Sequence, residues 1–299
     1  MDKGMRPPDI KFMDDAQYER FCALVVSNFA EHGETAEIVG GTAIVNGEKE
    51  RPLGLYNVAA ACAKGGEDTW KTTVAEHFRQ VRLAKEEGEN VARLAENFES
   101  VRNILMPRIY EKSKLLGYWQ EDFYVRSDLD GTKTFVVFDM PTSTTHVNRT
   151  HSKNWGKTDA EIFAVAMENL GKRPMVPTGI DNERPGQTVY FFDGDVFTSS
   201  LALRVADGQE WVGPFGALVV VPNRNRLIVH PIEGFDSGRV YEILGPYAWK
   251  EHASSPGAVS PFVYWFYKGT FTACGVLDEN NIPVPMVPEK LTRLLRGET

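Results

Sequence analysis

Cysteine is scarce in this sequence, and long hydrophobic runs are absent. The 299 residues contain three cysteines, Cys22, Cys62 and Cys274, whose wide separation leaves no CxxC or CxxH pair. We therefore expect no zinc site, no redox dithiol and no cofactor. No apolar stretch approaches the roughly 18 residues of a membrane-spanning helix, and the first residues lack the apolar stretch of a signal peptide. These absences predict a cytoplasmic protein without a membrane partner.

An excess of positive charge is also missing. The formal net charge is -8, and nucleic-acid affinity depends largely on lysines and arginines that replace condensed counterions. We therefore predict no nucleic-acid partner. Hydrophobic residues at 42% and charged residues at 25% are typical of a globular protein. The length allows one large domain or two of ordinary size.

The motifs of common enzyme classes are absent. There is no GxSxG nucleophile elbow and no GxxxxGK[ST] phosphate-binding loop. His146 and His151 fit neither the helical HExxH spacing nor an HxH pair on a strand, so we predict no metal site. The sequence therefore assigns no catalytic residue.

Local patterns in the first third predict helices and a hairpin. Apolar residues at helical spacing follow Asp14 and continue to Gly33, which predicts one amphipathic helix. Gly40-Gly41 lies between two β-branched runs and predicts a two-residue hairpin turn. Further helices are predicted over 69–81 and 91–105, separated by a Glu-rich interval.

The remaining patterns predict antiparallel strands and a few helices. Asp130-Gly131 marks a second hairpin, and Thr158 with Glu161 forms a capping box that begins a helix. Gly216 to His230 reads as two apolar strands joined by a turn at Pro222 to Asn225. The fold class predicted is α+β, with helix-hairpin units, antiparallel sheets and two lobes. The lobes predicted are 1–115 and 116–299, the second with an aromatic strand extension from about residue 233.

Residues near the turn at Pro222 to Asn225 are the candidate ligand-binding residues. Arg224 presents a rigid fork of donors that suits a carboxylate or phosphate. Ser199 and Ser200, with either Asp193 or Asp195 and with His230, supply the residue types of a catalytic triad, although types alone define no geometry. At the end of an apolar strand, the histidine is more typical of a buried or edge position. The candidates are Asp193, Ser199, Ser200, Asn223, Arg224 and His230.

Several stretches also carry a family resemblance through their order and spacing. They are Ile104-Leu105-Met106-Pro107-Arg108, the strand end 136–141, the helix 161–170, the run 193–203 and, most closely, 220–229. Together they resemble the YtpQ-like family of uncharacterised bacterial proteins over about residues 16–232. The resemblance supports the α+β fold and implies no activity or catalytic residue. The family usually has Asp after the Arg of its PxR motif, where this sequence has Asn225, and the tail from about Glu233 looks like an addition.

Two functions are compatible with these observations. The first is a non-catalytic intracellular binding or adaptor protein, whose aromatic residues after Glu233 cover a protein or peptide surface. Its expected partner is a protein, and its acidic surface would suit a basic toxin in bacterial defence. The alternative is a small-ligand binder or enzyme with an anion-binding pocket around Arg224.

Overall fold

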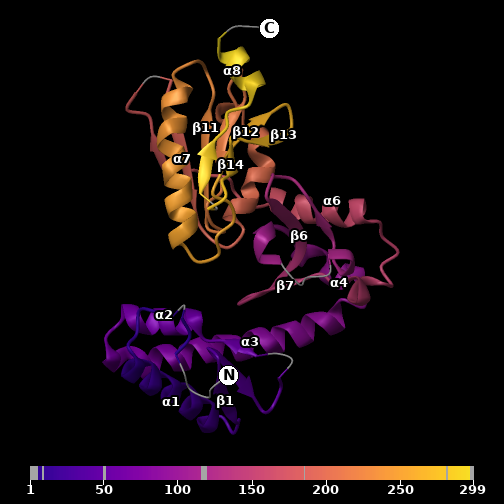
Figure 1. Ribbon diagram of the computed structural model, residues 1–299. Coiled ribbons are helices and arrows are strands. Elements are labelled where there is room, and N and C mark those ends of the chain that lie inside the picture. Colours follow the sequence, from indigo (N-terminus) through magenta and orange to yellow (C-terminus); the bar gives the residue numbers. More distant parts are fainter. Residues whose placement is uncertain are drawn as a thin grey trace. The chain divides into compact units, whose positions relative to one another are not determined.

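A computed structural model describes residues 6–8, 10–49, 52–115, 120–184, 186–280 and 282–296 (Figure 1). Its helices and antiparallel sheets confirm the α+β class. The chain forms two compact units, Met1–Glu89 and Asn90–Thr299. The boundary between them lies inside the helix α3 (Trp70–Leu94), earlier in the chain than the sequence-based boundary at about residue 115. No helix among the described residues is long and apolar enough to cross a membrane.

The first unit packs helices on a small antiparallel sheet. Asp14 caps the first helix and forms a capping box with Gln17, and Gly40 and Gly41 take positive φ angles in the hairpin, so both local predictions are confirmed. Aromatic side chains such as Phe21 and Phe78 fill its core. The elements are α1 (Asp15–Glu31), β1 (Ala36–Val39), β2 (Thr42–Val45), β3 (Leu53–Gly54), α2 (Tyr56–Lys64), a 3-10 turn η1 (Glu67–Thr69) and the first part of α3.

The predicted interruption at the Glu-rich interval is wrong. Helix α3 continues through it to Leu94, because Glu, Lys and Ala are good helix formers and one glycine is tolerated. The helix predicted over 91–105 is also wrong in extent. After α3 the chain forms only a short helix and a 3-10 turn, α4 (Phe98–Val101) and η2 (Arg102–Ile104), and then enters a strand at Leu105.

The second unit begins with a four-stranded antiparallel sheet. The strand order is β4-β6-β5, and β7 also pairs with β6. Helix α6 packs against β4, and Phe138, Trp155 and Ile162 belong to the core of this part. Its elements are β4 (Leu105–Glu111), η3 (Lys112–Leu115), η4 (Gln120–Asp122), β5 (Val125–Arg126), β6 (Thr132–Asp139), β7 (Thr144–His146), α5 (Arg149–Ser152) and α6 (Asp159–Gly171).

A six-stranded antiparallel sheet forms the rest of this unit, in the order β13-β12-β10-β11-β9-β8. Alternate residues of β10 face opposite ways: Leu218 and Val220 pack in one core cluster with α7, Ala217 and Val219 in another with η5. Its elements are β8 (Gly179–Asp181), β9 (Val189–Asp193), η5 (Thr198–Asp207), η6 (Gln209–Trp211), β10 (Ala217–Val220), β11 (Arg226–Pro231), α7 (Ser237–Ser254), β12 (Val263–Tyr267), β13 (Thr270–Ala273), β14 (Gly275–Leu277), β15 (Pro283–Pro285) and α8 (Glu289–Leu295).

The aromatic strand β12 lies inside this sheet. It pairs with β10 on one side and β13 on the other, and Tyr264, Trp265 and Phe266 are buried. Residues after Glu233, which looked like an addition in sequence, therefore supply a helix and an interior strand to the core. Of the aromatic side chains of β12, which was expected to cover a partner, only Tyr267 is partly exposed.

Candidate functional site

The turn that carries Arg224 is held in place by hydrogen bonds on several sides. The backbone N–H of Arg224 donates to Gly257 O at 2.9 Å, and the backbone N–H of Ser199 donates to Arg224 O at 3.0 Å. Within the turn, Asn225 N donates to Asn223 Oδ1 at 3.0 Å, and Asn225 Nδ2 donates to Gly194 O at 2.8 Å. The backbone from which the Arg224 side chain departs is therefore preorganised.

Gly257 sets the course of the Arg224 side chain. Its φ is +68°, and a Cβ at this position would lie 2.7 Å from Arg224 Cδ. The Arg224 side chain therefore packs directly on the backbone of residue 257, where a positive φ and the lack of room for a Cβ favour glycine. From there its side chain reaches a cavity.

This cavity, which we call the cationic cavity, has a volume of about 270 Å³. Strand β4, the end of β7, the Arg224 turn and the loop at Gly257 to Val259 line it. Its polar side chains come from Arg108, Tyr110, Glu111, Lys114, His146 and Arg224. Two guanidinium groups from distant parts of the sequence thus meet in one hollow.

Arg108 is the most constrained of these side chains. It is only 8% exposed, donates through Nη1 to Thr144 Oγ1, and its Nε has no hydrogen-bond partner within the described part of the chain. Its guanidinium lies 4.9 Å from the centre of the Tyr110 ring. Burial, together with the positive charge of Arg224, lowers the pKa of Arg108. Because an arginine stays protonated in proteins, the result is a charge held at an energetic cost.

No carboxylate of the described residues lies at ion-pairing distance from Arg108 or Arg224. Neighbouring arginines are paired: Arg173 with Asp139 and Asp195, and Arg226 with Asp193. The cationic cavity therefore keeps two guanidinium charges that form no ion pair with a described carboxylate, although the charge of Asp195 acts on Arg108 at longer range.

His146 and Glu111 complete the wall without cancelling its charge. Burial and the charge of Arg108 lower the pKa of His146 to about 4, so at neutral pH it is a neutral ring, 5.0 Å from the Tyr110 ring. Glu111 is ionised. Although burial raises its pKa, hydrogen bonds from His252, Ser113 and Lys114 lower it to about 2. Its negative charge is engaged by Lys114 at 3.0 Å and His252 at 3.1 Å.

The remaining sequence candidates do not join this site. Asp193 pairs with Arg226 at 2.5 Å, and Asn223 supports the turn rather than lining the cavity. Ser199 and Ser200 are buried in η5, where their hydroxyls meet no hydrogen-bond partner among the described residues. Of the six candidates, Arg224 alone lines the cavity.

The catalytic triad considered from residue types is not assembled. His230 is fully buried, with Nδ1 2.7 Å from Thr188 O and Nε2 2.9 Å from Ser237 Oγ. Both ring nitrogens are therefore engaged away from Ser199 and Asp193. Burial lowers the pKa of His230. It also lies four residues along β11 from Arg226, roughly 13 Å in a strand, so it is remote from the turn.

Sequence reasoning missed Arg108 and His146. The available signal was the arginine inside the apolar run Leu-Met-Pro-Arg-Ile, since charged residues are almost never fully buried without a partner. This run was noticed only for its family resemblance. His146 was considered solely as a metal ligand, and its place beside Arg108 depends on the pairing of β6 with β7.

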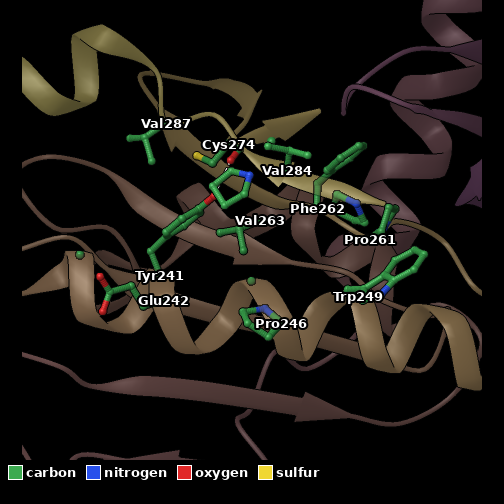
Figure 2. A pocket seen from close by; sticks show the side chains of 15 residues that line it. Tyr241, Glu242, Pro246, Trp249, Pro261, Phe262, Val263, Cys274, Val284 and Val287 are labelled. Carbon is green, nitrogen blue, oxygen red and sulfur yellow. Dashed lines mark hydrogen bonds between the residues drawn. The ribbon is translucent and has the colours of Figure 1, made fainter. Parts of the chain in front are cut away.

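A second hollow lies on the six-stranded sheet, between α7 and the hairpin formed by β14 and β15 (Figure 2). We call it the apolar groove. Its volume is about 730 Å³, and its walls include Tyr241, Trp249, Phe262 and Val284. The exposed side chains of Val284 and Val287 line it, so this groove is an apolar surface open to a ligand.

Comparisons with protein-family models, with curated proteins and with solved structures give no match for this chain. Membership of the YtpQ-like family therefore stays a prediction. Any functional conclusion depends on the geometry of the two hollows.

Proposed function

We propose that the protein binds a small anionic ligand, with a carboxylate or phosphate group, in the cationic cavity. The observation that carries this proposal is the buried guanidinium of Arg108, which has an unpartnered Nε among the described residues and a second guanidinium, Arg224, in the same cavity. An anion would offset the cost of burying this charge and accept charge-assisted hydrogen bonds from both arginines.

The adaptor function predicted from the aromatic strand loses that support, because β12 is interior to the sheet. The cavity, in contrast, has rigid walls. Arg108 is placed by a strand, Arg224 by a hydrogen-bonded turn, and Thr144 orients the Arg108 guanidinium. Such preorganisation lowers the cost of ordering side chains on binding.

Calorimetric titration of the whole chain with phosphate, succinate and acetate tests the proposal. We expect the dianions to bind more tightly than acetate, because two guanidinium groups face the ligand. Arg224→Gln should weaken binding about 100-fold, since truncating one partner of a buried charged pair costs roughly 2 to 5 kcal/mol. The matched control is Arg226→Gln, two residues away and outside the cavity. Absence of binding by all three anions, or equal losses in both variants, would contradict the proposal.

A second variant separates binding from structural support. Arg108→Met replaces the guanidinium by an apolar side chain of similar length. We expect anion binding to be lost and the unfolding free energy to rise by about 1 to 2 kcal/mol, since a buried charge without a partner is removed. Thermal denaturation in phosphate-free buffer measures this change. A large loss of stability would show instead that Arg108 supports the fold.

A further inference from the structure

The apolar groove follows one face of α7. Gly238, Tyr241, Gly245 and Trp249 are spaced by three or four residues and so lie on the same side of the helix. Phe262, just before β12, together with the β14–β15 hairpin, forms the opposite wall (Figure 2). A volume of about 730 Å³ is within the range of roughly 300 to 1,000 Å³ that small-molecule sites occupy.

The two glycines of this face are not required by the packing of the protein. A Cβ at Gly238 or Gly245 would meet no atom within 4 Å, and neither residue takes a positive φ. Glycine is a poor helix former relative to alanine, so a side chain at either position would be tolerated by the fold. What the glycines do provide is depth, because each exposes the helix backbone to the groove.

A smaller apolar cavity of about 50 Å³ adjoins the groove. Both hollows share Gly238, Tyr241 and Val287, and the smaller one reaches Leu218 and Ile232. The helix face from Gly238 to Trp249 is about 16 Å long at 1.5 Å per residue. The two hollows therefore offer a mostly apolar space along this face of α7.

The backbone of the groove favours a hydrocarbon chain over an extended peptide. Four of its fifteen lining residues are prolines, which have no N–H to donate. Cys274 donates its N–H to Val263 O, and its carbonyl accepts from Met286 N and the Tyr241 hydroxyl. A peptide strand would bury its polar groups here with few partners, whereas a hydrocarbon chain needs none.

One of the fifteen lining residues is charged. Glu242 is exposed beside Tyr241 (Figure 2) and makes no ion pair with any of the described residues. A cationic head group would be attracted to this carboxylate, and an anionic one repelled. We propose that the apolar groove binds a single alkyl chain with a cationic head group, such as a long-chain amine.

Titration of the whole chain with dodecylamine, dodecanol and dodecanoate below their aggregation concentrations tests this proposal. The measurements use the Arg224→Gln variant, so that binding of the dodecanoate carboxylate in the cationic cavity does not contribute to the signal. Quenching of the Trp249 fluorescence places the ligand in the groove. The Trp249 signal is identified as the part that Trp249→Phe lacks. We expect the amine to bind at least tenfold more tightly than dodecanoate, with dodecanol between them, and Glu242→Gln to remove the difference between amine and carboxylate.

Gly245→Leu provides the occupancy test, because its side chain would enter open space in the groove. We expect at least a tenfold loss of dodecylamine affinity with an unchanged or higher melting temperature. Gly88→Leu, at another open helical position outside the groove, is the control and should leave binding unchanged. Unaltered binding in Gly245→Leu would overturn the proposal. So would preferred binding of dodecanoate, or a concentration-dependent dimer that Gly245→Leu abolishes, which would assign the groove to a second copy of the chain.

Discussion

The cationic cavity and the apolar groove belong to the same unit, and each contains a feature that lowers stability. The feature is a buried charge in the cavity and a pair of helical glycines in the groove. The cavity keeps a buried guanidinium, Arg108, that forms no ion pair with a carboxylate of the described residues. The groove keeps glycine at positions 238 and 245, where the helix has room for a side chain. The cavity retains a charge that forms no ion pair within the described part of the chain, and the groove retains space beside its helix that no side chain fills there. Features of this kind concentrate where a protein binds something.

The comparison also separates the forces at work. Electrostatics and hydrogen bonds control the cavity, so its properties should depend on pH, salt and charge-changing substitutions. Apolar contact area controls the groove, so it should respond mainly to side-chain volume. The following predictions test this contrast, from the largest expected effect to the smallest.

Acidification should destabilise the cavity wall through His146. Its folded pKa of about 4 lies below the ordinary value of 6.5, so the unfolded chain binds the proton more readily. The contribution of His146 to stability is complete above about pH 6.5 and is lost as pH falls towards 4. We expect on the order of 3 kcal/mol from this group, since a shift of about 2.5 pKa units corresponds to roughly 1.4 kcal/mol per unit.

Urea denaturation of the parent and of His146→Phe between pH 7 and pH 4.5 measures this contribution. The slope of unfolding free energy against pH should be clearly smaller in the variant. Equal slopes would show that the ring does not titrate as its position in the cavity requires.

Gly257→Ala should disturb the cavity more than the positive φ alone explains. The change combines backbone strain at φ +68° with a Cβ 2.7 Å from Arg224 Cδ. We expect a loss of about 2 kcal/mol in unfolding free energy, within the range of roughly 1 to 3 kcal/mol for strained positions, and weaker phosphate binding. Gly156→Ala is the matched control, since Gly156 has φ +61° and open space around it. If both variants lose equal stability and keep equal affinity, the contact with Arg224 is unimportant.

Asn225→Asp tests the position at which the resembled family usually has aspartate. The amide Nδ2 donates to Gly194 O, and an ionised carboxylate cannot donate. The unfolding free energy, measured by denaturation in phosphate-free buffer, should fall by about 1 kcal/mol, a typical value for one hydrogen bond. Phosphate affinity should also fall, because a negative charge is placed beside Arg224. Unchanged stability and affinity would show that aspartate serves equally well in this turn.

Gly245→Ala should have the smallest effect, and in the opposite direction. The methyl group enters open space, and alanine is the better helix former by up to about 1 kcal/mol. We expect the free energy of unfolding, measured by thermal denaturation, to rise by about 0.5 kcal/mol. Phosphate binding at the cationic cavity should not change. A loss of stability would mean that the glycine is needed for the course of α7 beside Pro246 rather than for the groove.

Sequence patterns predicted those features that depend on neighbours in the chain. The helix cap at Asp14, the capping box at Thr158, the glycine turn of the first hairpin and the two strands around Pro222 to Asn225 are all present. They were predictable because each depends on hydrogen bonds or φ angles within a few residues. The extent of α3 was missed because a charged segment that forms helix well has no apolar periodicity to reveal it.

The candidate site was predictable only in part. Arg224 was identified from the chemistry of its turn, and it does line a cavity. Asp193, Ser199, Ser200 and His230 were grouped with it by proximity in sequence. The strand register instead pairs Asp193 with Arg226 and places His230 towards the other end of β11.

By itself, the sequence determined the α+β class and the hydrogen-bonded turn that presents Arg224, because local hydrogen bonding and hydrophobic patterning are written into consecutive residues. Only the tertiary structure decided that Arg108 on β4 meets this arginine in one cavity, and that the aromatic strand lies between two others. These outcomes depend on which strands pair and on which side chains are then left without an ion-pairing partner. These contacts join residues far apart in the sequence, and the order and register of the strands determine them.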